Sequence, residues 1–141
     1  MTAKIYRLSV LAGSFLFAAI SAGHAESMTF AAHLLGSAAV PQNKSDAFGE
    51  AQFTYNSDTR QLDYYVTYDG ISPTKIDFHG PAGPAENAAT ILSIPVSETP
   101  ISGTINLTRD QANILLAGKA YLDMPSKAYA DGEIRGQVQK Q

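Results

Sequence analysis

Two residues with chemically capable side chains, Asp77 and His79, lie two positions apart in a segment that alternates apolar and polar residues. Residues with this spacing on a β-strand leave the same face, so we expect the two side chains to lie together. A carboxylate and an imidazole supply half of a nitrogen and oxygen ligand set for a transition-metal ion. Asp123 or Glu133 could complete the set only if the fold brought one of them near. The alternative is a polar strand edge beside a loop.

Glu133 and Arg135 form a second pair with the same spacing, on the face opposite the apolar residues of their segment. We expect an arginine–carboxylate ion pair, within this strand or across to the next one, that fixes the register of the last strand. Gly132 and Gly136 bracket the pair. A glycine inside a strand usually marks a bulge or the close approach of a neighbour, so these four residues are predicted to have a structural or binding role.

No arrangement typical of catalysis occurs in the sequence. The chain has no cysteine, no Gly-x-Ser-x-Gly sequence and no phosphate-binding glycine loop. We therefore predict no catalytic residues and no cofactor, with a transition-metal ion held by Asp77 and His79 as the alternative. A small hydrolase with paired carboxylates is a weaker alternative, because it needs two acids that converge in a pocket. The net charge of -3 disfavours sequence-independent binding to nucleic acid.

The N-terminus is typical of a secretory signal. Two basic residues precede an apolar run over residues 8–20, and small residues follow up to Ala25. The apolar run is too short to span a bilayer. We predict a signal peptide over residues 1–25 and a single domain over residues 26–141 with no transmembrane segment. An exported domain without disulfides suits the periplasm or the cell exterior.

From residue 26 onward the dominant hydrophobic period is two, which indicates β-strands. The clearest example is a hairpin in which residues 50–55 and 62–68 alternate around a cluster of turn formers. His33 falls on the polar face of its strand, so we expect it to point outward. The weaker strand segments are residues 28–35, 75–79, 90–94, 101–107, 119–124 and 133–139.

One short helix is expected after the strand at residues 101–107. Thr108 and Gln111 match a capping box, and Gly118 is a natural residue beyond the helix end. With about seven to eight short strands punctuated by turns, the chain is predicted to be an all-β, antiparallel β-sandwich, immunoglobulin-like or Greek-key, with one short helix.

Separated segments of the chain share a family pattern. Its most specific parts are an Leu-Ala-Gly-x-x-Tyr stretch that ends at Tyr121 and the Gly-Glu-Ile-Arg-Gly-Gln stretch at residues 132–137. With the Gly-Pro-Ala that follows His79, these motifs resemble the chordin-type (CHRD) domain, a β-rich module of exported bacterial proteins and of animal chordin. Animal chordin binds growth factors of the bone morphogenetic class. The resemblance implies an exported binding or structural module, and it carries over no catalytic residue.

The chain departs from the family pattern at two positions. The family often has His-x-His before Gly-Pro-Ala, and here the first position is Asp77. The family often has a second histidine site after the tyrosine, and here that position is Pro125. If those histidines form a metal site in the family, this chain has lost most of it.

The segment at residues 80–89, Gly-Pro-Ala-Gly-Pro-Ala-Glu-Asn-Ala-Ala, is the longest irregular stretch. We expect it, or an exposed sheet edge, to bind a protein or glycan partner, and self-association into a homo-oligomer is a further expectation. Tyr121 is grouped with the structural or binding residues. The predicted interaction loop comprises Gly80, Pro81, Ala82, Gly83 and Pro84.

Overall fold

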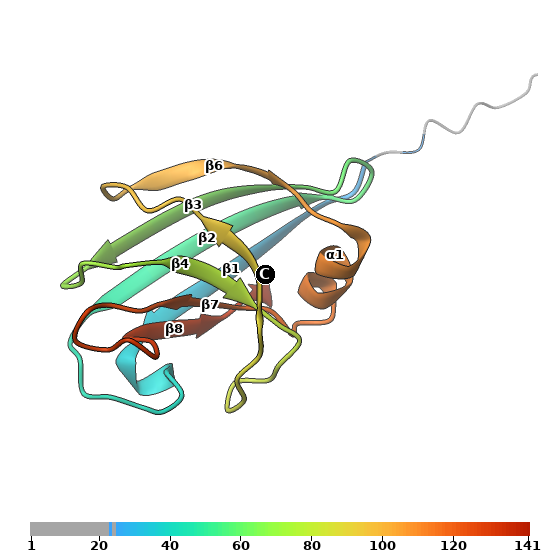
Figure 1. Ribbon diagram of the computed structural model, residues 1–141. Coiled ribbons are helices and arrows are strands. Elements are labelled where there is room, and N and C mark those ends of the chain that lie inside the picture. The colour runs from blue at the N-terminus through green and yellow to red at the C-terminus, as the bar shows by residue number, and fades with distance from the viewer. Residues whose placement is uncertain (1–22, 24) are drawn as a thin grey trace, which may run out of the picture.

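The computed structural model describes residue 23 and residues 25–141, so nearly all of the predicted signal segment lies outside the described residues. Strands dominate the described part of the chain (Figure 1). No helix in this part has the length and apolar character that crossing a membrane requires. The elements are β1 (Ser27–Leu35), η1 (Gly36–Ala38), β2 (Phe48–Asn56), β3 (Gln61–Asp69), β4 (Ile76–His79), β5 (Thr90–Ile94), β6 (Ile101–Asn106), α1 (Arg109–Leu116), β7 (Tyr121–Met124), β8 (Ile134–Gln137) and β9 (Gln139–Lys140).

The strands form one antiparallel sheet in the order β5-β4-β7-β8-β1-β2-β3-β6, and β9 pairs with β1. The sheet curls, so that its two halves face each other across one core (Figure 1). Phe53 of β2 and Phe78 of β4 are not on neighbouring strands, yet their ring centroids lie 5.2 Å apart. The prediction of an all-β, antiparallel class with one short helix is confirmed.

The long strands follow the alternation of the sequence. In β2 every second residue from Gly49 to Tyr55 is buried, and the residues between them are exposed. Phe53 pairs with Tyr64 across the hairpin, so the apolar faces of both strands point into the core. His33 points outward as predicted, and its side chain is 77% exposed.

The helix α1 closes one end of the curled sheet (Figure 1). Thr108 Oγ1 accepts a hydrogen bond from Gln111 N, and Gln111 Oε1 accepts one from Thr108 N, so the capping box is confirmed. Gly118 has a φ of +69°, a conformation that glycine adopts without strain. The helix is short and depends on docking, which buries Ala112 and Leu115 against the sheet.

The strands β4, β7 and β8 are only four residues long each and are buried on both faces. Their inner face carries Phe78, Leu122 and Ile134, all of which belong to the core. Their outer face carries polar and aromatic residues, and the segment at residues 80–89 lies against four of them, His79, Tyr121, Arg135 and Gln137. This covered outer face holds the residues that the sequence singled out.

Candidate functional site

Two rows of side chains cross the outer face of β4, β7 and β8. Asp77 pairs with Asp123, which in turn pairs with Arg135. One step along the strands, His79 pairs with Tyr121, which pairs with Gln137. Because residues two apart on a strand share a face, the two rows lie side by side. The site therefore contains Asp77, His79 and Arg135 together, with Asp123 between two of them.

Arg135 is the centre of this site and is only 2% exposed. Its Nη2 donates to the carbonyl oxygens of Gly83 at 2.9 Å and Glu86 at 2.7 Å, and its Nη1 donates to Asn87 Oδ1 at 3.1 Å. The guanidinium also lies over the Tyr121 ring, 3.5 Å from the ring centroid. Burial lowers the pKa of Arg135 from its ordinary value. A planar guanidinium suits both a fork of hydrogen bonds and an aromatic face, so one side chain fixes three points of the loop.

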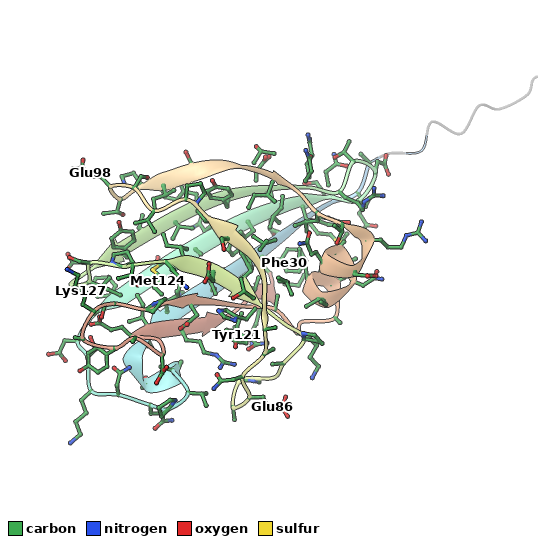
Figure 2. All side chains as sticks on the ribbon, in the orientation of Figure 1. Phe30, Glu86, Glu98, Tyr121, Met124 and Lys127 are labelled. Atoms are coloured by element: carbon green, nitrogen blue, oxygen red, sulfur yellow. The ribbon has the colours of Figure 1, made fainter. Side chains whose placement is uncertain are left out.

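Tyr121 and His79 extend this contact into a stack. Their rings are nearly parallel, with centroids 4.9 Å apart. The Tyr121 hydroxyl accepts from Ala88 N at 2.9 Å and donates to Ala88 O at 3.3 Å, and His79 Nδ1 lies 2.8 Å from Ala88 O. Figure 2 shows Tyr121 at the strands and Glu86 toward the far end of the loop. The stack of Arg135, Tyr121 and His79 therefore supports the loop from beneath.

The loop at residues 80–89 has little freedom of its own. Gln137 Nε2 donates to Ala82 O at 2.9 Å, and Asn87 Nδ2 donates to Val40 O at 3.0 Å. At the start of the loop, a Cβ on Gly80 would lie 2.6 Å from Ile114 Cγ2 and 2.8 Å from Lys119 O. Only glycine fits such a close approach to backbone. The loop is thus held at its start, its middle and its end.

The expected ion pair between Arg135 and a carboxylate, within the strand or across to the next one, is not formed among the described residues. The one contact within 4 Å between a basic and an acidic side chain among the described residues joins exposed His33 and Glu50. Glu133 is 7% exposed, and its Oε1 accepts a 2.5 Å hydrogen bond from Ser45 Oγ. Glu133 lies just before β8 and is bound to Ser45, whereas Arg135 on β8 reaches the loop carbonyls instead. The prediction of the pair was wrong.

Gly132 and Gly136 each lie where a larger residue would collide. Gly132 has a φ of +123°, and a Cβ there would lie 2.6 Å from Asp123 Oδ1. A Cβ on Gly136 would collide with the backbone of His33 on β1. The first glycine lets the chain pass the Asp123 carboxyl, and the second lets β8 approach β1.

Asp123 has an unusual electrostatic environment. Burial raises the pKa of its carboxyl to about 6, and the charge of Asp77 acts in the same direction. His79 and Arg135 lower this pKa but do not compensate for the burial. A carboxyl with this pKa exchanges its proton near neutral pH.

The residues proposed as half of a metal site already have protein partners. Asp77 Oδ1 accepts a 2.5 Å hydrogen bond from Ser93 Oγ, and His79 Nδ1 faces the Ala88 carbonyl. Asp77 and Ser93 line a cleft of about 410 Å³ beside β4 and β5. Within the described part of the chain, no group of three or more His, Asp or Glu side chains is placed to hold one metal ion. Glu133 Oε1 accepts its hydrogen bond from Ser45.

Sequence reasoning missed the residues that bind Arg135, Glu133 and Asp77. Asn87 accepts from Arg135, Ser45 donates to Glu133 and Ser93 donates to Asp77. The segments around Asn87, Ser45 and Ser93 carry no spacing that predicts these bonds. Tyr121 was selected only as part of a motif, and its role as the middle of a stack follows from strand register. The cross-strand register is what the sequence could not supply.

Taken together, the fold and the site define an all-β module in which a buried arginine fixes a long surface loop. The CHRD domain family model matches residues 30–138, which includes every strand that forms the site. The chain belongs to the CHRD domain family. No curated protein and no solved structure matches the chain.

Proposed function

We propose that this CHRD domain protein is a non-enzymatic binding module that works outside the cytoplasm, in the periplasm or at the cell exterior. The loop at residues 80–89 is its recognition element. The observation that carries the proposal is the buried Arg135, whose three hydrogen bonds and aromatic stack hold the loop in one conformation. The partner is a protein or a glycan.

The use of the polar side chains supports binding over catalysis. Arg135, His79 and Asp77 each bind a neighbouring group of the protein, so they are committed to architecture. A nucleophile or general base has to be free to reach a substrate. What the site presents to solvent is the loop itself, with Pro81, Pro84, Ala85, Glu86 and Asn87 exposed.

A fixed loop is suited to recognition because it loses little conformational entropy when a partner binds. Functional residues are often placed on loops that a rigid scaffold positions. Beside the tip of this loop lies a cleft of about 460 Å³, lined by Pro84 and Ala85 on one side and residues 37–40 and 42 on the other. The loop and this cleft form one continuous surface for a partner.

The test is to compare two substitutions that add the same charge in different places. Ala85→Arg changes the loop tip, and Gln52→Arg changes the exposed face of β2 away from the loop. Partners are captured from the extracytoplasmic fraction of the source cells by the wild-type protein and by both variants. We expect a protein or glycan that the wild type and Gln52→Arg retain and Ala85→Arg loses. Equal retention by all three would contradict recognition by the loop.

Two further measurements on the same preparation test the remaining parts of the proposal. Intact mass is expected to place the first residue of the exported protein at Glu26, and a protein that keeps residues 1–25 would contradict export by signal cleavage. Metal content is measured without chelators, with His79→Ala alongside. A stoichiometric transition metal that disappears in the variant would replace the binding-module proposal by the metal-binding alternative.

A further inference from the structure

Among the described residues, the strand β6 ends the sheet and is bonded on one side only, to β3. Leu107 N donates to Arg60 O at 2.9 Å, which continues the ladder between these strands. In an antiparallel ladder, alternate residues direct their backbone groups to the same neighbour. Ile101, Gly103 and Ile105 therefore face β3. The backbone N–H and C=O groups of Ser102, Thr104 and Asn106 face the free edge.

This edge lacks the devices that normally block pairing between sheets. Its six residues, Ile-Ser-Gly-Thr-Ile-Asn, include no charge and no proline, and its register with β3 is regular. The opposite edge differs. Its strand β5 pairs irregularly with β4 at Phe78 and His79, and it ends before Pro95. The backbone carbonyl of Ile91 in β5 is already bound, because Gln111 Nε2 of α1 donates to it at 2.6 Å. One edge of the sheet is protected and the other is open.

We propose that β6 pairs antiparallel with β6 of a second copy of this chain, so that one sheet runs through a two-fold symmetric dimer. With the axis at Thr104, Thr104 of one copy lies opposite Thr104 of the other, and Ser102 of each copy lies opposite Asn106 of the other. Each of these residues then exchanges backbone hydrogen bonds with its counterpart. All three side chains are polar, uncharged and exposed on the outer face, so no like charges meet.

The charges nearest the axis do not oppose the pairing. Asp63 of β3 accepts a 2.6 Å hydrogen bond from Thr104 Oγ1 and lies one strand inward from the edge. Across the dimer the two Asp63 residues are separated by three strand spacings, about 14 Å. This exceeds the distance of about 8 Å over which salt screens exposed charges under physiological conditions. A second copy thus fits this edge in hydrogen bonding and charge.

The experiment compares Ser102→Pro with Ser102→Ala. Proline removes a donor from the free edge and leaves the ladder to β3 intact, whereas alanine keeps the donor. By sedimentation equilibrium, we expect a concentration-dependent dimer for the wild-type protein and for Ser102→Ala. The dissociation constant should rise about tenfold or more in Ser102→Pro. The two-fold axis makes each substitution remove two backbone hydrogen bonds from the dimer, one donated by each copy. Circular dichroism checks that each variant is folded.

Two further readouts apply if Ser102→Pro fails to fold. Ser102→Lys keeps every backbone donor and adds a charge at the edge, and it is expected to weaken the dimer in the same way. In the wild type, amide exchange at Ser102, Thr104 and Asn106 should slow as the concentration rises, with no such change for the exposed residues of β2. A wild-type monomer at all concentrations, or a dimer that Ser102→Pro and Ser102→Lys both leave intact, would overturn the proposal. Edge amides that stay unprotected would overturn it as well.

Discussion

The outer faces of the two halves of the curled sheet differ in what lies over them. In the open half, β1, β2, β3 and β6, the outer face meets solvent, and buried and exposed residues alternate along β2. In the covered half, β4, β7 and β8, the loop at residues 80–89 lies over Arg135, Tyr121 and His79, and Asp77 is buried beside Ser93 of β5. A polar residue on the open half meets water, whereas one on the covered half has to find a protein partner. The covered half therefore carries the buried polar contacts that hold the loop.

The largest effect is expected from Arg135→Ala. The substitution leaves the carbonyls of Gly83 and Glu86 without their donor and removes the packing on Tyr121. We expect the free energy of unfolding to fall by about 3 kcal/mol, measured by denaturant titration. The matched change in the open half is Arg60→Ala, which removes one hydrogen bond from an exposed arginine and should cost about 1 kcal/mol or less. Equal losses in the two variants would remove the contrast between the halves.

Gly136→Ala tests the seam where the covered half meets the open half. Its new methyl group would collide with the backbone of His33, which cannot move without disturbing β1. Overpacking of this kind costs about 1–3 kcal/mol. Gly83→Ala is the control, because a Cβ there would lie at an ordinary contact distance, 3.5 Å, from Glu86 Oε2. Thermal unfolding of both variants should show a lower Tm for Gly136→Ala alone, and an unchanged Tm would mean that β8 and β1 can separate.

Asp123→Asn tests the electrostatics of the covered half. Its pKa is about 6 in the folded protein against an ordinary 3.8, so the folded state binds the proton more tightly than the unfolded state. Stability from this group is present below about pH 4 and is lost as the pH rises through 6. The full difference corresponds to about 3 kcal/mol, and partial exposure reduces it to about 1–2 kcal/mol.

The measurement is the free energy of unfolding of wild type and Asp123→Asn between pH 4 and pH 7.5. The wild-type value should fall relative to that of the variant as the pH rises, because asparagine has no proton to lose. Subtracting the two curves removes the contributions of the other acids. A constant difference across this range would show that the Asp123 carboxyl is solvated like an exposed one.

Glu50→Ala on the open half should have the smallest effect. Glu50 Oε1 lies 3.7 Å from His33 Nδ1, but the two side chains are 59% and 77% exposed. Exposed ion pairs of this kind contribute about 0–1 kcal/mol. We expect an unchanged denaturation midpoint at neutral pH. A fall in the free energy of unfolding as large as that of Arg135→Ala would show that side chains on the open face make contacts as strong as those of the covered half.

The sequence predicted the open half far better than the covered half, for a physical reason. On the open half one face is wet, so apolar and polar residues alternate and residues such as Phe53 can be assigned to the core directly. On the covered half both faces are buried, and the outer one is filled by Arg135, Tyr121 and His79 rather than by aliphatic side chains. Spacing alone put Asp77 and His79 on one face, but their partners depend on register between strands far apart in the chain.

The position of the first strand has a consequence for how the protein is made. β1 lies in the interior of the sheet, where Leu35 pairs with Arg135 of β8 and Ala31 pairs with Gln139 of β9. Gln141 N also donates to Thr29 O. The β1–β2–β3 meander can form early during synthesis, because its contacts are close in sequence. The other side of β1 has to wait for residues 134–141, so completion of the sheet depends on contacts of very high sequence separation, which form slowly. A nascent chain of this protein stays incompletely folded until these residues have been made.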